Sequence, residues 1–208
     1  MNFITNPDIE KYLYSLSIDE DPVLLEMEQY GHSLNFPIVD KLVGKLLYIL
    51  TKIKKPKLVV ELGSGFGYSA YWFAKALENG GKVVLNEYKE ENIKLAQKFF
   101  KKANLLDKAV FEIGDAVENA QKYKDIDILF LDHEKSRYLE AVKTLEKNLS
   151  EEALIIADNV LWHGKVIEKE PDNKTKKIME FNEYMFKSGK YFSSIIPLRD
   201  GVLIALKL

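Results

Sequence analysis

The stretch VVELGSGFGYSA, residues 59–70, decides the fold of this chain. It starts as an apolar run, passes through three glycines at alternate positions, and continues into apolar residues at helical spacing, Tyr71, Ala74 and Leu77. An apolar run, a glycine turn and a helical pattern in this order predict a strand, a tight turn and a helix. We therefore expect the first unit of a nucleotide-binding α/β sheet.

The residues around this turn indicate which ligand it takes. A dinucleotide-binding turn needs a further glycine where this chain has Tyr68, and it places a pyrophosphate at the helix N-terminus. Here an acid, Glu61, precedes the glycines, and a hydroxyl, Ser69, follows them just inside the helix. Such a site suits a ligand with a carboxylate for the helix N-terminus and an amine or sulfonium for the nearby acids. We expect S-adenosylmethionine at this turn, with S-adenosylhomocysteine (SAH) as the product.

Further residues are expected to hold the same ligand. The glycines of the turn are Gly63, Gly65 and Gly67. Glu87 ends the next apolar strand, where a carboxylate can take both ribose hydroxyls. Asp115 follows a later strand, where the adenine amino group would need an acceptor, although a helix N-cap explains this aspartate equally well. A strand, glycine turn and helix without any ligand is the alternative for the whole unit.

Length and composition limit the remaining possibilities. A chain of 208 residues, 47% of them hydrophobic, is long enough for one domain with a sizeable core. We expect a single domain over residues 1–208, with N-terminal helices over 1–55 and the ligand-binding α/β core over 56–208. The absence of cysteine excludes disulfides, thiolate metal sites and a cysteine nucleophile. The start of the chain carries no leader pattern and no stretch is apolar enough to span a membrane, so we expect a cytoplasmic protein without a membrane partner.

The spacing of apolar residues predicts the other elements. Helices are expected over residues 7–16, 22–32 and 39–50, before the sheet. Strands over 58–62, 83–86, 109–113, 126–131 and 153–157 then alternate with helices over 90–103, 117–121 and 138–149. A polar loop, 158–174, a helix, 175–187, and a hairpin of strands 191–197 and 202–207 follow. Unbroken apolar strands between helices predict a mostly parallel, doubly wound α/β sheet that ends in an antiparallel hairpin, which resembles the Rossmann-like fold of class I methyltransferases.

Polar side chains follow two strands whose carboxyl ends should be neighbours. Asp132 follows one strand, and Asp158 and Asn159 follow the next strand along the chain. Three oxygen donors at one point suit Mg²⁺ or a similar divalent cation, which can bind two vicinal hydroxyls and lower the pKa of one of them. Lys135, three residues after Asp132, is the expected general base.

Each of these residues also has a purely structural explanation. Asp132 can cap a helix, Asp158 with Asn159 can form an Asx turn, and Lys135 can be a surface lysine. A functional site is favoured because all these positions fall on the same edge of the predicted sheet. His163, four residues after Asn159, we interpret as a loop histidine rather than a ligand.

As a set, these motifs resemble the cation-dependent O-methyltransferases of the catechol and caffeoyl-CoA type. The likeness runs from about Glu26 to the C-terminus. The segments that carry it are residues 61–69, 114–116, 132–135 with Tyr138, and 158–162 with Gly164. The resemblance implies that Asp132, Asp158 and Asn159 bind the cation and that Lys135 is the catalytic lysine.

The same resemblance assigns residues to the cofactor. It implies that Glu87 binds the ribose and that Ser69 binds the carboxylate of the methionine part. Asp115 and Ala116 match the adenine contacts. His133 is similar to a histidine at this position in animal catechol methyltransferases. The expected cofactor-binding set is completed by Glu61, Gly63, Gly65, Gly67 and Asp132.

The identity of the methyl acceptor stays open. The first hypothesis is a small hydroxylated aromatic of the catechol kind. Residues 26–30, 36–38, 43–47, 181–184 and 197–201 are also similar to bacterial members that methylate 5-hydroxyuridine at the wobble position of tRNA. Lysines near the third helix would offer tRNA a basic surface, although a solvated helix face explains them more simply and the net charge of −2 calls for no polyanionic partner. A noncatalytic S-adenosylmethionine-binding module is a third hypothesis, and we expect a homodimer.

Overall fold

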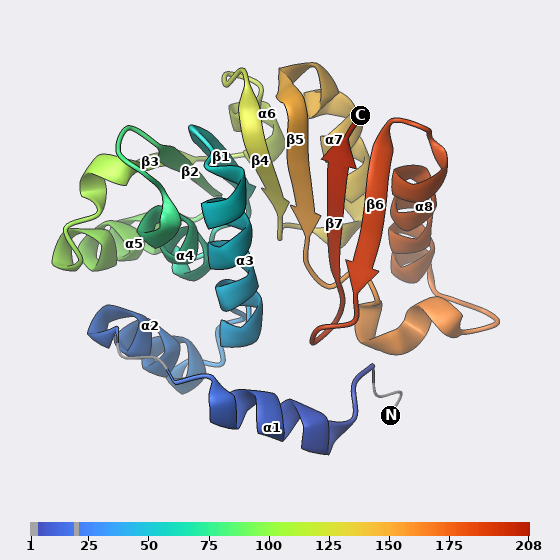
Figure 1. Ribbon diagram of the computed structural model, residues 1–208, viewed down its shortest axis with the longest axis horizontal. Coiled ribbons are helices and arrows are strands. Elements are labelled where there is room, and N and C mark those ends of the chain that lie inside the picture. The colour runs from blue at the N-terminus through green and yellow to red at the C-terminus, as the bar shows by residue number, and fades with distance from the viewer. Residues whose placement is uncertain (1–3, 19–20) are drawn as a thin grey trace.

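The computed structural model describes residues 4–18 and 21–208. The strands of its sheet are β1 (Leu58–Leu62), β2 (Lys82–Glu87), β3 (Ala109–Ile113), β4 (Ile126–Leu131), β5 (Leu149–Ala157), β6 (Tyr191–Ile196) and β7 (Val202–Lys207). They lie in the order β3-β2-β1-β4-β5-β7-β6 (Figure 1). β1 to β5 are parallel, whereas β7 is antiparallel to both β5 and β6. The predicted sheet with a terminal antiparallel hairpin is therefore confirmed.

Helices cover both faces of this sheet. The helices are α1 (Pro7–Leu16), α2 (Pro22–Ser33), α3 (Lys41–Lys54), α4 (Tyr68–Ala76), α5 (Glu90–Lys102), α6 (Ala116–Ala120), α7 (Tyr138–Leu145) and α8 (Asn173–Lys187). Successive residues of a strand point to opposite faces, so Val59 packs with α3, α4 and α5 while Val60 packs with α6, α7 and α8. Both valines are fully buried, as expected of a parallel strand with helices on each side.

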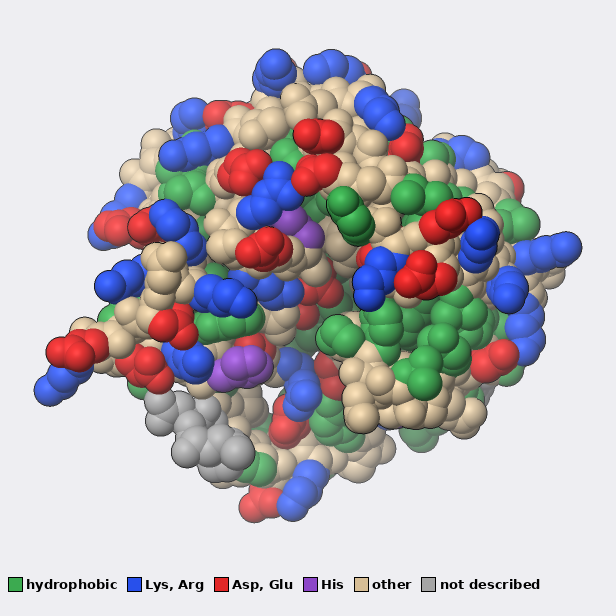
Figure 2. Space-filling view, turned by 180° about the vertical axis from the view of Figure 1, so that it is seen from behind, with side chains coloured by type: hydrophobic (Ala, Val, Ile, Leu, Met, Phe, Trp, Pro, Cys, Tyr) green, Lys and Arg blue, Asp and Glu red, His purple; other side chains and the backbone are tan. Residues whose placement is uncertain are grey.

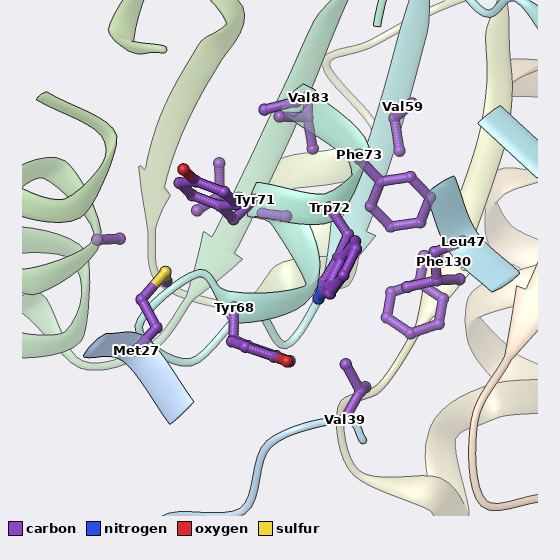
Figure 3. Packing of buried hydrophobic residues seen from close by; sticks show 14 of the residues in the cluster. Met27, Val39, Leu47, Val59, Tyr68, Tyr71, Trp72, Phe73, Val83 and Phe130 are labelled. Carbon is purple, nitrogen blue, oxygen red and sulfur yellow. The ribbon is translucent and has the colours of Figure 1, made fainter. Parts of the chain in front are cut away.

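The first of these two cores is rich in aromatic residues from α4 (Figure 3). The ring of Phe73 meets that of Phe130 on β4 edge to face, with centroids 5.5 Å apart. Trp72 lies directly against α3, where a Cβ atom on Gly44 would stand 2.2 Å from the indole nitrogen. Glycine at this helix position therefore allows α3 to approach α4 closely. The helix that follows the glycine turn is thereby fixed on the sheet.

Several predicted boundaries differ from the structure, and α3 extends to Lys54, beyond the predicted end at residue 50. α7 ends earlier than predicted and is followed by a 3₁₀ turn, Glu146–Asn148, and β5 begins at Leu149. The pairing of β5 with β4 shifts register near its start, and Glu152 there has a left-handed φ of 53°. This bulge places two exposed acids inside the strand. The first half of β5 therefore lacks the apolar pattern from which the strand was predicted. The predicted polar loop 158–174 also contains a 3₁₀ segment, Trp162–Ile167.

The N-terminal helix α1 is held by polar contacts. None of its residues is buried. Glu10 pairs with Arg199 in the turn between β6 and β7, Tyr14 donates a hydrogen bond to Asp40 just before α3, and Thr5 bonds the backbone of the same β6–β7 turn. Figure 1 shows α1 below the lower ends of β6 and β7. Within the described residues, no helix combines the length and the apolar character needed to cross a membrane.

Candidate active site

A cleft of about 740 Å³ lies at the carboxyl ends of β1 to β5. All the predicted site residues line it except Glu61 and Gly67. Figure 2 shows an opening in the lower part of the molecule that is bordered by acidic and basic side chains and by a histidine. The topology explains this grouping, because the ends of parallel strands meet at one edge of the sheet. The structure thus brings together residues that lie up to about a hundred positions apart in the sequence.

The glycine turn after β1 is required by packing as well as by any ligand. Gly63 has a φ of 88°, and a Cβ atom on it would lie 2.7 Å from the carbonyl oxygen of Asp132. Gly67 is also left-handed, but a Cβ atom there would meet Leu85, Ala96 and a phenylalanine of α5. Gly67 therefore borders the core, whereas Gly63 borders the end of β4. Glycine patterns alone do not separate these two roles.

The acid before the turn and the hydroxyl after it are paired with each other. The Ser69 hydroxyl donates a hydrogen bond to Oε1 of Glu61, which is fully buried. Oε2 of Glu61 has no hydrogen-bond partner among residues 4–18 and 21–208. Burial raises the pKa of Glu61 to about 8, and the negative charges of Asp132 and Glu87 add to that increase. A buried carboxylate with a free oxygen is a place where a cationic ligand group would be stabilised.

Glu87 and Asp115 face the other end of the cleft. Glu87 accepts hydrogen bonds from the backbone amides of Gly65 and Lys89, at 3.0 and 2.9 Å. Oδ1 of Asp115 caps α6, so the predicted helix-cap explanation is confirmed. Its Oδ2 accepts a hydrogen bond from Arg137 at 2.6 Å, and this guanidinium lowers the pKa of Asp115. Ala116, which follows the cap, is the first residue of α6 and lines the cleft.

The acids after β4 and β5 lie together. Lys135 donates a hydrogen bond to Oδ1 of Asp132 at 2.7 Å, and its side chain is only 16% exposed, so it is not a surface lysine. Asp158 is 5% exposed, and its Oδ1 has no partner among the described residues. Burial raises the pKa of Asp158 to about 7, with a further increase from the charge of Asp132. Burial also raises the pKa of Asp132, although Lys135 acts against this. Asn159 follows with a left-handed φ of 58°.

These residues fit a hard divalent cation. Asp158 is buried and Asp132 is partly buried, and their raised pKa values favour a positive charge between them. Oδ1 of Asp158 has no partner among the described residues. Asn159 adds an amide oxygen to the same part of the cleft. In the part of the chain that is described, no cluster of three or more histidine, cysteine, aspartate or glutamate side chains is arranged to hold a metal. The expected ligand set is not such a cluster, because it contains only two acids and its third donor is the amide of Asn159.

Some residues of the cleft, such as Arg137, were not anticipated, whereas His133 was expected there as a cofactor contact. Arg137 holds Asp115, and His133 is largely buried, with its ring 5.2 Å from that of Tyr138 and a pKa lowered to about 4 by burial. Both ring nitrogens of His133 are without partners among the residues described. Asp200, in the β6–β7 turn, contacts His163. The only sequence signal for Arg137 was its rarity, since the chain has two arginines. The segment 36–39 also lines the cleft.

Comparisons with known proteins agree with this architecture. A family model for O-methyltransferases matches residues 14–208, which include every residue that lines the cleft. A catechol O-methyltransferase of Niastella koreensis is 29% identical over 214 residues, covering 95% of this chain and 96% of the relative. A methyltransferase structure from Geobacter sulfurreducens is 33% identical with a TM-score of 0.86, covering 99% of this chain and 100% of that one. An O-methyltransferase structure from Bacillus cereus in complex with SAH is 27% identical with a TM-score of 0.87, covering 97% of each chain.

Proposed function

The chain belongs to the O-methyltransferase family, and on that premise we propose that it methylates a hydroxyl of a catechol-like small aromatic with the help of a divalent cation. The methyl donor is S-adenosylmethionine, as the SAH-bound relative supports. The observation that carries the proposal is a pair of acids, the buried Asp158 and the partly buried Asp132, beside Lys135 in the same cleft as the glycine turn. We propose that the whole chain acts as one methyltransferase domain.

The cofactor would occupy the β1 to β3 side of the cleft. Glu87 is proposed to bind the ribose hydroxyls, because its carboxylate lies at the end of β2 and is already fixed by two backbone amides. Glu61 and Ser69 are proposed to hold the amine and carboxylate of the methionine part, since the Ser69 hydroxyl at the start of α4 donates a hydrogen bond to Glu61 near the end of β1. Asp115 with Ala116 would contact adenine, and His133 would pack beside the adenosyl group. This arrangement leaves the β4 and β5 side for the acceptor.

Asp132, Asp158 and Asn159 are proposed to hold the cation. A divalent cation held there would supply a positive charge that lowers the pKa of the reacting hydroxyl. The oxygen donors support this assignment, as does Oδ1 of Asp158, which has no partner among the residues that the structure describes. Asp158 is buried at the end of β5, so its oxygen has little competition from water.

Lys135 is proposed to take the proton of the reacting hydroxyl. Its Nζ lies 2.7 Å from Oδ1 of Asp132, so it is held at the point where the hydroxyl would bind. The new oxygen–carbon bond then forms as the carbon–sulfur bond breaks, the electron pair stays on sulfur, and the proton stays on Lys135. Most of the remaining rate enhancement comes from alignment of oxygen, methyl carbon and sulfur.

A tRNA acceptor would need free cations on one face of the molecule. Several lysines near α3 have other contacts: Lys54 donates to the carbonyl of Glu152 at 2.8 Å, and Lys55 pairs with Glu78 at 3.8 Å. Lys45 lies over the ring of Trp72 and donates to a backbone carbonyl. These contacts favour the small aromatic over tRNA. The homodimer and the cytoplasmic location stay predictions.

The proposal is tested by methyl transfer from labelled S-adenosylmethionine. Catechol, a panel of substituted catechols and tRNA lacking the wobble modification are offered in parallel, each with Mg²⁺ and with chelator. We expect labelling of catechols that chelator abolishes. Labelling of tRNA alone would show that tRNA, and not a catechol, is the methyl acceptor. Labelling that is insensitive to chelator would contradict the proposed role of a divalent cation.

The role of Lys135 has its own test. Lys135→Met is expected to lower kcat by roughly 10²- to 10³-fold, because a positioned base contributes about that much. Lys124→Met is the matched control, since Lys124 is exposed on a loop outside the cleft. An unchanged kcat and pH profile for Lys135→Met would assign proton removal to another group.

A further inference from the structure

His163 stands on an unusual turn beside the cleft. Trp162, His163 and Gly164 have consecutive left-handed φ values of 48°, 55° and 74°. Such values cost free energy in non-glycine residues and persist only where the surroundings impose them. This turn begins three residues after Asn159, so it lies next to the proposed cation ligands. The sequence interpretation of His163 as an ordinary loop histidine does not explain this geometry.

The turn is imposed by the loop between β6 and β7. The amides of Val160 and Leu161 donate to the carbonyls of Gly201 and Asp200, at 3.1 and 2.9 Å. The amide of His163 donates to Oδ1 of Asp200 at 2.5 Å. A Cβ atom on Gly201 would lie 2.4 Å from Leu161, so the two loops are in direct contact. Asp200 thus fixes the backbone of His163 from a segment almost forty residues away.

The same aspartate also faces the imidazole. Nδ1 of His163 lies 3.4 Å from Oδ2 of Asp200, while the His163 side chain is 72% exposed and that of Asp200 only 11%. The ring of His163 lies 5.4 Å from that of Trp162, and both residues line the cleft. Nδ1 lies on the side of the ring nearer the carboxylate, although Oδ2 of Asp200 has no hydrogen-bond partner among the described residues. Nε2, on the other side of the ring, is left available to a ligand.

We propose that His163 determines acceptor specificity by binding, through Nε2, a carboxylate substituent on the aromatic acceptor, with Asp200 as its positioning residue. The inference rests on the proposed function, because it places the acceptor between Asp132 and His163. An oxygen anion suits this position better than an amine for two reasons. An imidazole donates a strong hydrogen bond to a carboxylate. The acid that would attract an amine, Asp200, is buried behind the histidine.

The test compares two acceptors that differ only in the carboxylate, 3,4-dihydroxybenzoate and catechol. For His163→Ala we expect the ratio of kcat/KM for 3,4-dihydroxybenzoate over catechol to fall about tenfold, chiefly through KM. Asp200→Asn should lower the same ratio by about threefold, because the amide can still accept the His163 backbone bond but holds Nδ1 less strongly. His32→Ala is the matched control, since His32 is exposed on α2 and lies outside the cleft.

Equilibrium binding tests the role of His163 separately from the proposed function. Calorimetric titration of 3,4-dihydroxybenzoate into the wild-type chain and into His163→Ala should show the same tenfold difference, and SAH titration checks that the variant is folded. If catechol is methylated but the ratio and the affinity do not change in His163→Ala, the inference is overturned and the proposed function stands. If 3,4-dihydroxybenzoate binds in a manner that depends on His163 but no catechol is methylated, the carboxylate-binding role of His163 stands and the proposed function falls. A chain that neither binds nor methylates 3,4-dihydroxybenzoate overturns the inference.

Discussion

The two sides of the cleft are built differently. On the cofactor side, the glycine turn and α4 are neighbours in sequence, and all of α4 except Lys75 is buried. On the acceptor side, Asp158 keeps an oxygen without a partner among the described residues, and the following turn is left-handed at several non-glycine positions. Long-range polar contacts hold this second side together, including those from α1, which buries none of its residues. Local sequence specifies the first side, and tertiary contacts specify the second.

The largest effect is expected from the acceptor side. Asp158→Ala should lower kcat/KM for catechol by roughly 10³-fold, because it removes a charged ligand of the proposed cation. SAH affinity, measured by calorimetry, should change less than about threefold, since Asp158 lies beyond the cofactor residues. Glu151→Ala, an exposed acid on β5, is the matched control. Full activity in Asp158→Ala would contradict the cation assignment, and an equally large loss of SAH affinity would show that the two sides are not separable.

The second-largest effect is expected from a substitution on the cofactor side, which should weaken cofactor binding and leave the acceptor nearly unaffected. Glu87→Gln should weaken SAH binding by about 10- to 100-fold, because hydrogen bonds from two ribose hydroxyls to a charged group are replaced by bonds to a neutral one. The KM for catechol should remain within about threefold. Calorimetry with SAH and initial rates at saturating S-adenosylmethionine measure the two quantities. A larger effect on the acceptor than on SAH would place the ribose elsewhere.

Glu61 should make the stability of the cofactor-free chain depend on pH. Its pKa is about 8 in the folded chain against 4.5 as its ordinary value, so between these values the folded state binds the extra proton. The contribution of Glu61 to the stability of the folded chain is therefore fully present below pH 4.5 and is lost as the pH rises towards 8. Glu61→Gln should remove this contribution. The difference between Tm at pH 8.5 and Tm at pH 5 should then be about 5 °C more positive for Glu61→Gln than for wild type.

The comparison of Glu61→Gln with wild type cancels the titration of other groups. Thermal melts from pH 5 to 9 without cofactor provide the measurement. Glu112→Gln is a control with the opposite sign, because contacts with Tyr123 and Lys122 lower the pKa of Glu112. Parallel Tm curves for Glu61→Gln and wild type would show that Glu61 is ionised and solvated in the folded chain.

The smallest effect concerns the attachment of α1. Arg199→Ala removes the ion pairs with Glu10 and Asp40, and partly exposed pairs of this kind contribute only about 0.5 kcal/mol. We expect a small change in Tm but faster hydrogen exchange in α1, because the helix has no buried residues to hold it. Exchange in α4 should stay the same. Equal acceleration in both helices would mean that Arg199 stabilises the whole chain rather than one element.

Much of the fold could be predicted from the sequence, because the patterns that specify its strands and helices involve residues close together in the chain. The apolar run before Gly63 and the periodic residues after Ser69 reflect hydrogen bonding and packing within a few positions, and the structure follows them. The start of β5 was missed because a bulge exposes Glu151 and Glu152 within the strand. The contact of Asp115 with Arg137 was missed because it joins a helix cap to a separate turn after β4, and no spacing rule relates them.

The sequence by itself determined the order of strands and helices and the identity of the acids at the strand ends. Periodicity, glycine turns and parallel topology are sufficient for that, since they decide which residues fall at the carboxyl edge of the sheet. Only the tertiary structure decided the burial of Asp158, the ion pair of Lys135 with Asp132, and the position of His163 against Asp200. Burial, pKa values and left-handed turns depend on distant segments packed into one volume. No pattern of neighbouring residues records which of those segments will meet.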